Sequence, residues 1–243
     1  MTPRIFSDTK IDAGGPLELS GNSASHVIRV LRLRAGDDLI VFDGSGSEFP
    51  ARIEAISRQT VKLSTGTGRD PGTESKLKIT LFQGICRGQR MDLLIQKSTE
   101  LGIAAIHPIS CERSVVRIDD KRSRKKLDHW SQIAVSACEQ SGRVVLPTIA
   151  APASLTAAIE SPNDDEIRLL LDPCAEEDLG TPIDATQSIA LLIGPEGGLT
   201  DAERSAAKAA GFRPVRMGPR VLRTETAPLA AISILQYLAG DLR

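Results

Sequence analysis

The fold of this chain is decided by the stretch IALLIGPEGGLT at residues 189–200, together with MGPRVLRTETA at residues 217–227. Residues 189–193 are all apolar, which is typical of a parallel strand buried on both faces. The loop that follows has glycines at positions 194, 197 and 198, where the backbone can turn sharply or a ligand can come close. Both stretches predict a glycine-bearing loop between a strand and a helix, and in open α/β sheets ligands bind at such loops.

Local signals predict the elements around these loops. Thr200 and Glu203 have the spacing of a capping box, and Gly211 stands where a helix C-cap glycine belongs. We expect a short strand at residues 214–217 and an apolar helix at residues 228–238.

The glycines alone do not identify a ligand, because such loops are often only tight turns. A phosphate cradle is disfavoured, since the loop has neither the G-K-[ST] ending nor the G-x-G-x-x-G fingerprint. Glu196 would also repel a polyphosphate. A neutral or cationic ligand fits better, and a sulfonium such as S-adenosylmethionine is one.

Residues 192–200 and 217–227 resemble the C-terminal signature of the RsmE family. These are SPOUT-class RNA methyltransferases that methylate N3 of one uridine in the 16S ribosomal RNA of the small subunit. The resemblance implies an α/β fold with a SPOUT trefoil-knot methyltransferase domain at residues 75–243. It also implies a small N-terminal PUA-like β-barrel at residues 1–70 that docks the RNA, and a homodimer.

The resemblance further implies that loop backbone groups hold S-adenosylmethionine. The residues that it indicates are Leu171, Leu192, Gly194, Glu196, Gly197, Gly198, Met217, Gly218, Leu222, Thr226 and Ala227. A turn at residues 172–173 is a candidate for a further loop around the cofactor.

Methylation at N3 requires that the uracil lose a proton, so the site needs a base or a cation that stabilises the anionic ring. The signature motifs contain no histidine. We expect Arg223 to position or polarise the uracil, and Glu139 or Glu196 to accept the proton. The alternative for Arg223 is an internal ion pair with Glu225 that holds the loop.

The chain has a net charge of −1, yet residues 113–143 hold eight Lys and Arg against four Asp and Glu. A local basic patch is typical of phosphate binding, and a solvated, ion-paired helix surface is the alternative. We also expect a helix at residues 26–34 that buries Val27, Val30 and Leu31 and is ended by Gly36. This segment resembles the family's H-x-x-x-V-L-R motif, and residues 139–143 resemble its E-Q-x-x-R motif. The residues expected to contact RNA are His26, Arg29, Arg32, Arg113 and Arg143.

The rest of the chain fits two domains. Strands at residues 38–43, 48–56 and 60–63 predict a meander, and the breaker-rich residues 66–75 predict the domain boundary. From residue 77 onward, predicted strands alternate with predicted helices, as in an α/β domain. Trp130 lies on the apolar stripe of one such helix, and we expect its side chain to be in the core.

Composition is that of a globular protein without a signal peptide or an apolar run of membrane-spanning length. The four cysteines are scattered, which is typical of free thiols in a reducing cytoplasm and not of a metal site. Two alternatives remain open. One is a SPOUT enzyme that acts on a ribose 2′-hydroxyl or on tRNA, and the other is a non-catalytic RNA-binding or assembly factor.

Overall fold

The computed structural model of the chain describes residues 2–114, 120–160, 166–180 and 188–243. The predicted basic patch at residues 113–143 lies partly outside the described residues, as do the side chains of residues 120–122. The described chain divides into two compact units. The first contains residues up to 74 and residues 135–146, and the second contains residues 75–134 and 147–243.

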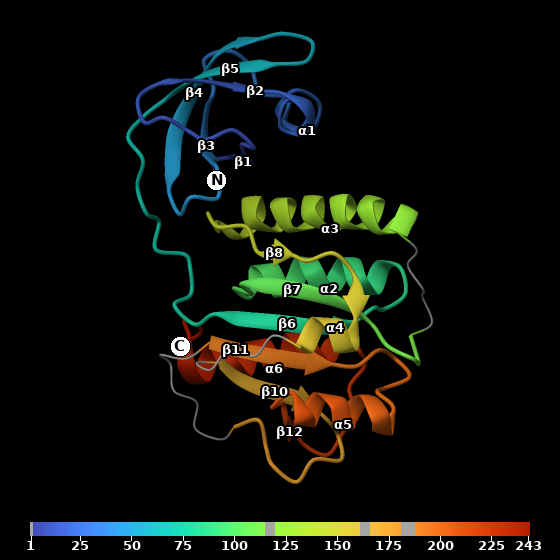
Figure 1. Cartoon of the computed structure of the whole chain (residues 1–243). Coiled ribbons are helices and arrows are strands. Elements are labelled where there is room, and N and C mark those ends of the chain that lie inside the picture. The colour runs from blue at the N-terminus through green and yellow to red at the C-terminus, as the bar shows by residue number, and fades with distance from the viewer. Residues whose placement is uncertain (1, 115–119, 161–165, 181–187) are drawn as a thin grey trace. The chain divides into compact units, whose positions relative to one another are not determined.

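The first unit is built on a five-stranded sheet with the order β1-β3-β4-β5-β2 (Figure 1). Strand β1 is parallel to β3, and the other neighbours are antiparallel. The predicted meander is confirmed, because its three strands pair in sequence order. The strands are β1 (Arg4–Phe6), β2 (Pro16–Leu19), β3 (Asp38–Phe42), β4 (Glu48–Ile56) and β5 (Val61–Thr65).

The helical segment of this unit differs from the prediction. A short helix α1 (Gly21–Ser25) continues as a π-helix, η1 (His26–Leu31). It ends at Arg32, which has φ 54° and ψ 37°, and not at Gly36. Because a π-helix has a wider turn than an α-helix, Val30 does not share the buried face of Val27 and is 69% exposed. The predicted burial of Val30 is therefore wrong.

Residues 135–146 belong to the first unit through polar and apolar contacts. The Glu139 carboxylate accepts a hydrogen bond from the N–H of Phe6 at 3.0 Å, and an Arg4 Nη2 atom donates to the carbonyl of Gly142 at 3.1 Å. Cys138 and Val144 pack against Phe42. This segment lies within helix α3 (Asp120–Ser141) and the loop after it. It comes after the predicted boundary at residues 66–75 in the chain, yet it belongs to the first unit.

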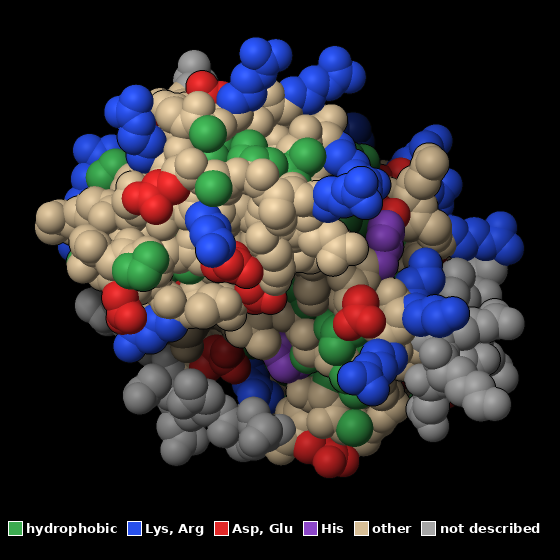
Figure 2. Space-filling view, turned by 90° about the horizontal axis from the view of Figure 1, so that it is seen from above, with side chains coloured by type: hydrophobic (Ala, Val, Ile, Leu, Met, Phe, Trp, Pro, Cys, Tyr) green, Lys and Arg blue, Asp and Glu red, His purple; other side chains and the backbone are tan. Residues whose placement is uncertain are grey.

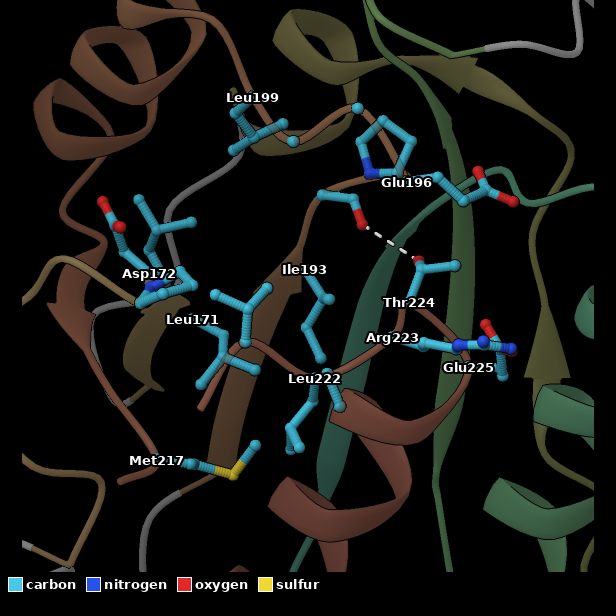
Figure 3. Close-up of a pocket in the computed structure, with 18 of the residues that line it drawn as sticks. Leu171, Asp172, Ile193, Glu196, Leu199, Met217, Leu222, Arg223, Thr224 and Glu225 are labelled. Atoms are coloured by element: carbon cyan, nitrogen blue, oxygen red, sulfur yellow. Dashed lines mark hydrogen bonds between the residues drawn. The ribbon is translucent and has the colours of Figure 1, made fainter. Parts of the chain in front are cut away.

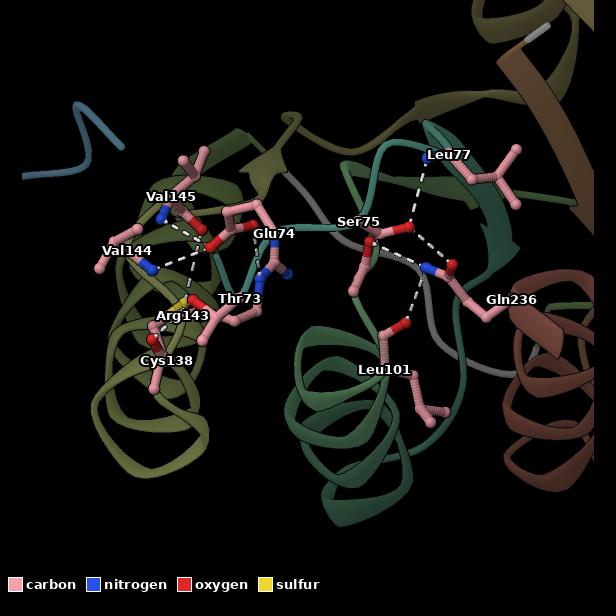
Figure 4. Close-up of polar contacts among 12 residues, drawn as sticks. Thr73, Glu74, Ser75, Leu77, Leu101, Cys138, Arg143, Val144, Val145 and Gln236 are labelled. Carbon is pink, nitrogen blue, oxygen red and sulfur yellow. Dashed lines mark hydrogen bonds and ion pairs between the residues drawn. The ribbon is translucent and has the colours of Figure 1, made fainter. Parts of the chain in front are cut away.

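An ion pair completes the attachment of this segment (Figure 4). Arg143 is 5% exposed and donates through Nε and Nη2 to one oxygen of Glu74, at 3.1 and 2.8 Å. The other oxygen of Glu74 accepts the N–H groups of Val144 and Val145 at 2.8 and 3.0 Å. Burial raises the pKa of Glu74, but Arg143 and the two N–H groups outweigh it and leave the pKa below its ordinary value.

The second unit is a parallel sheet with the order β12-β10-β11-β6-β7-β8, and β9 also pairs with β7. Its strands are β6 (Ile79–Gly84), β7 (Ala105–Ser110), β8 (Thr148–Ile149), β9 (Ala153–Ser154), β10 (Glu166–Leu171), β11 (Ser188–Ile193) and β12 (Arg213–Val215). Its remaining helices are α2 (Gln89–Glu100), α4 (Leu155–Ile159), α5 (Asp201–Ala209) and α6 (Thr226–Ala239).

Helices cover both faces of this sheet, with α2 and α6 on one side and α4 and α5 on the other (Figure 1). The pleat of β11 explains its continuous apolar sequence. Ile189, Leu191 and Ile193 pack on the α2–α6 side, whereas Ala190 and Leu192 pack on the α4–α5 side. The predicted buried parallel strand is confirmed, and the buried Trp130 lies in the α2–α6 core as expected.

The predicted capping box is also present. The Thr200 hydroxyl accepts from the N–H of Glu203 at 3.2 Å, and the Glu203 carboxylate accepts from the N–H of Thr200 at 2.8 Å. Helix α5 then ends before Gly211, which has φ 86°. Together these end signals fix the path of the chain from β11 to β12.

The start of the second unit is bound to α6 through Gln236, a fully buried amide (Figure 4). It accepts a hydrogen bond from the Ser75 hydroxyl at 2.8 Å and donates to the carbonyl of Leu101 at 3.1 Å. A Cβ atom on residue 240 would lie 1.8 Å from the Gln236 amide oxygen, so any larger residue there would displace this side chain. The two hydrogen bonds of Gln236 connect α6 to Ser75 and to the end of α2.

Candidate functional site

A pocket of about 660 Å³ opens in the second unit, in the loops that follow the carboxyl ends of β10, β11 and β12 (Figure 3). Its position agrees with the general rule for parallel α/β sheets, and its volume lies within the usual range for small-molecule sites of about 300–1,000 Å³. The lining residues are Arg90, Leu170 to Pro173, Ile193 to Leu199, Arg204, Met217, Gly218, Arg220 to Glu225 and Ala227.

The interior of the pocket is apolar. Leu171, Ile193, Met217 and Leu222 come from separate segments, and their side chains surround a common space (Figure 3). All four pack against the α2–α6 core. A flat, weakly polar group such as a nucleobase would be matched by these side chains.

The glycine-rich loop is both a tight turn and a wall of the pocket. Gly198 has φ 68°, and its N–H donates to the carbonyl of Pro195 at 2.8 Å. At the end of the neighbouring strand β6, a Cβ atom on Gly84 would lie 2.3 Å from the Pro195 nitrogen. The absence of a side chain at Gly84 therefore allows the end of β6 to lie directly against this loop.

Residues 217–225 form another wall of the pocket, and their backbone N–H groups are free for a ligand. Among the described residues, no N–H from Met217 to Glu225 donates to a backbone carbonyl. Gly218 has φ 64°, and the helical hydrogen bonds begin only with Thr226 and Ala227, whose N–H groups both donate to the carbonyl of Arg223. A bound molecule with acceptor atoms can satisfy these donors.

Arg90 of α2 forms ion pairs with carboxylates from two of the pocket loops. Arg90 Nη1 lies 3.1 Å from a Glu196 carboxylate oxygen, and Arg90 Nε lies 3.7 Å from a Glu225 oxygen. The N–H of Arg87 also donates to Glu196, at 3.3 Å. Sequence reasoning missed Arg90, because a pair between α2 and two distant loops leaves no local signal.

Arg223 is exposed and lines the pocket. In the part of the chain that the structure describes, its guanidinium has neither a hydrogen bond nor an ion pair, and Glu225 pairs with Arg90 instead. The internal Arg223–Glu225 ion pair that was considered from the sequence is therefore not formed. A free cation beside an apolar pocket is available to a substrate.

The structure brings most of the predicted cofactor residues together. Leu171, Gly194, Glu196 to Gly198, Met217, Gly218, Leu222 and Ala227 line the pocket. Leu192 and Thr226 do not, among the residues described. The pleat turns Leu192 toward the α4–α5 core, and Thr226 is exposed at the start of α6.

Asp172, Pro173 and Thr224 line the pocket but were not among the predicted cofactor residues. The signal for the first two was the turn after the apolar run of β10. Thr224 lies within the motif at residues 217–227, but no local pattern singled out its side chain, which is buried.

The predicted proton acceptors are in different units. Glu196 lines the pocket of the second unit, whereas Glu139 belongs to the first unit. Burial raises the pKa of Glu139, and the Phe6 N–H and His26 offset part of this rise. The His26 Nδ1 atom lies 3.8 Å from the Glu139 carboxylate.

The predicted RNA-binding residues also separate into two groups. Arg29, Arg32 and Arg113 are exposed, and Arg113 Nη1 donates to the carbonyl of Gly197 at 3.4 Å. Arg143 is buried against Glu74, so its guanidinium is not accessible to a phosphate in this structure. Lys and Arg side chains stand out across the face shown in Figure 2, with Asp and Glu side chains between them.

Other chemistries have little support in the described residues. They contain no group of three or more His, Cys, Asp and Glu side chains that could hold a metal ion. No described helix is long and apolar enough to cross a membrane. Cys86 lies behind the pocket loops, and burial raises the pKa of its thiol to about 11, so the thiol is not a ready nucleophile.

Comparisons with known proteins agree with the geometry. Residues 73–236 match an RNA methyltransferase domain family, and residues 19–65 match an RNA methyltransferase PUA domain family. The chain is 32% identical over 241 residues to a ribosomal RNA small subunit methyltransferase E of Buchnera aphidicola, covering 99% of this chain and 95% of the relative.

Two solved structures cover the whole of both chains. One is a methyltransferase from Legionella pneumophila in complex with its cofactor SAM, with 39% identity and a TM-score of 0.94. The other is a ribosomal RNA small subunit methyltransferase E from Neisseria gonorrhoeae bound to S-adenosylmethionine, with 36% identity and a TM-score of 0.93. The predicted fold, a PUA-like unit followed by a SPOUT methyltransferase domain, is confirmed.

Proposed function

The chain belongs to the ribosomal RNA small subunit methyltransferase E family, and we propose that it methylates N3 of a uridine in 16S ribosomal RNA with S-adenosylmethionine as the methyl donor. The observation that carries this proposal is the pocket at the ends of β10, β11 and β12, with the unpaired Arg223 at its lining. Two similar chains were solved with this donor bound.

The residues of the pocket fit this donor. Leu171, Ile193, Met217 and Leu222 would hold the adenine, and the free N–H groups of residues 217–225 would bind its nitrogen atoms and the ribose. The carboxylates of Asp172 and Glu196 suit a cationic ligand. When bound, the donor supplies a methyl group on a positively charged sulfur to the attacking nitrogen.

The chain's own groups would then prepare the uracil. We assign Arg223 to the uracil, because its charge would stabilise the anion that forms when N3 loses its proton. Glu196 is the stronger candidate for the proton acceptor, since it lines the same pocket. Glu139 is the weaker candidate, because it belongs to the first unit, whereas the pocket lies in the second.

We further propose that the first unit docks the RNA. His26, Arg29 and Arg32 lie on or directly after the π-helix η1, where π-helical turns are often functional. Arg32 is the one described non-glycine residue with a positive φ, and such strained backbone is concentrated at functional positions. In the second unit, Arg113 beside the glycine-rich loop is a further candidate for an RNA contact.

The enzyme is proposed to be a cytoplasmic homodimer that acts on 16S RNA or on the 30S subunit. Support for the dimer comes from α6, where Ile234 and Leu238 are each 37% exposed and Tyr237 is 63% exposed. Sedimentation at micromolar concentration should give the mass of two chains, and a monomer would contradict this part of the proposal.

The proposed function is tested by the position of the methyl group. The purified protein, S-adenosylmethionine and unmodified 30S subunits or 16S RNA are incubated, and the RNA is digested to nucleosides for mass spectrometry. We expect N3-methyluridine. A methyl group on ribose, activity only on tRNA, or donor binding without turnover would each contradict it.

A further inference from the structure

Three segments of the second unit meet at the buried side chain of Thr224, between the exposed Arg223 and the ion-paired Glu225. Gln83, at the end of β6, donates from Nε2 to the Thr224 hydroxyl at 3.1 Å. The Thr224 hydroxyl donates to the carbonyl of Gly194 at 3.2 Å, the bond drawn in Figure 3. The three segments are therefore connected by two side-chain hydrogen bonds.

The direction of these bonds is set by the chemistry of the groups. Gln83 Nε2 also donates to the carbonyl of Gly84 at 3.0 Å, and a carbonyl can only accept. A flipped amide would place two oxygens together, so the nitrogen must face Gly84 and Thr224. The Thr224 oxygen then accepts from Gln83, and its single proton is directed to Gly194.

The buried side-chain amide of Gln83 destabilises the fold. Gln83 is fully buried, and its Oε1 atom has no hydrogen-bond partner among the described residues. A buried acceptor without a partner costs roughly 1–3 kcal/mol. An apolar side chain of similar size would avoid this cost, so stability alone does not explain an amide here.

We call the two hydrogen bonds from Gln83 through Thr224 to Gly194 the relay. A close backbone contact lies beside it. The close approach of Gly84 to Pro195 fixes the end of β6 against the glycine-rich loop. The relay then ties the Arg223 loop to the same two segments. Arg223 has no polar partner of its own among the described residues, so its placement depends on its neighbours in the chain.

Resting on the function proposed above, we propose that Gln83 and Thr224 are positioning residues for methyl transfer. They hold the Arg223 loop in register with the Gly194 carbonyl, so that Arg223 and the donor loop face the same uracil. Loss of either group should lower the rate of the chemical step far more than the affinity for the donor.

The test compares variants of matched shape. Thr224→Val removes the hydroxyl, Thr224→Ser keeps it, and Gln83→Met removes the donor. Single-turnover rates are measured with saturating 30S subunits and S-adenosylmethionine, donor affinity by calorimetry, and folding by thermal melting. Thr148→Val, at an exposed threonine of the same unit, is the matched control.

We expect Thr224→Val and Gln83→Met each to slow methyl transfer by about 10–100-fold, the scale of a small misplacement of reacting groups. Thr224→Ser should restore most of the rate. The double variant Gln83→Met/Thr224→Val should be no slower than Thr224→Val alone, because both changes break one relay.

Several results would overturn the positioning role. They are unchanged rates in both single variants, additive losses in the double variant, an equal loss of donor affinity, and unfolding of all three variants. If the wild type methylates an atom other than uridine N3, the proposed function is wrong, whereas the comparison of variants still decides the role of the relay in that reaction.

Discussion

Arg143 and Arg223 both lie in motifs that resemble the same family, yet the structure gives them opposite surroundings. Arg143 is buried, and its partner Glu74 also accepts two backbone N–H groups. Arg223 is exposed beside an apolar pocket and has no polar partner among the described residues. In this protein the arginine with a complete set of partners stabilises the fold, whereas the arginine without a polar partner is available for chemistry.

The largest effect should come from Arg223→Ala. We expect methyl transfer to fall by about 10³-fold, the loss typical of removing one preorganised donor from an active site. Donor affinity and the thermal midpoint should stay near those of the wild type. Calorimetry and melting curves check this, and loss of the fold would assign Arg223 to the structural class of Arg143.

Arg143→Met should give the converse result. It leaves the partly buried Glu74 carboxylate without its cation, so we expect the free energy of unfolding to fall by about 3 kcal/mol. The rate per folded molecule should change far less than in Arg223→Ala. Urea unfolding measures the loss, and Glu74→Gln, which keeps an oxygen for Val144 and Val145 but leaves the buried Arg143 cation without its carboxylate, should lose a similar amount. A stable Arg143→Met variant with weak RNA binding would instead support the RNA contact expected from the sequence.

A smaller, local effect is expected at the start of α5. Thr200→Ala removes the capping hydroxyl and should cost about 1 kcal/mol of unfolding free energy. Ser205→Ala, at an exposed position of the same helix, is the matched control and should change little. Equal losses in both variants would contradict the capping role that the structure gives to Thr200.

The smallest effect concerns pH. The pKa of Glu74 lies below its ordinary value, so its contribution to stability is complete above that ordinary value and is lost as the pH falls through the folded-state pKa. Glu139, whose pKa is raised, has the opposite sign and stabilises the fold more at low pH. Unfolding between pH 7 and pH 3 should therefore show less acid-induced loss in Glu74→Gln than in the wild type. An unchanged loss would mean that other carboxylates dominate.

Sequence patterns correctly predicted the features that depend on residues close together in the chain. The buried strand at residues 188–193 and the capping box at Thr200 depend on neighbouring residues, and both are present. The burial of Val30 was predicted wrongly, because a π-helical hydrogen-bond pattern changes which side chains share a face. The side of the sheet that Leu192 faces is set by the strand's register and pleat, which a uniformly apolar run does not reveal.

Contacts between distant segments were beyond local patterns. Residues 135–146 join the first unit through Glu74, Phe6 and Arg4, and nothing within that segment indicates its partners. Arg90 and Gln83 reach the pocket loops from α2 and β6 in the same way. Family resemblance located the pocket loops, and the structure was needed to separate the paired side chains from the free one.

The most direct test of the account is a crystal structure of this protein with S-adenosylmethionine. We expect the donor in the pocket bounded by Leu171, residues 194–198 and residues 217–222, with Arg223 free to meet the uracil. A donor bound elsewhere, or an Arg223 side chain engaged on the carboxylate of the donor, would contradict the role assigned to this arginine.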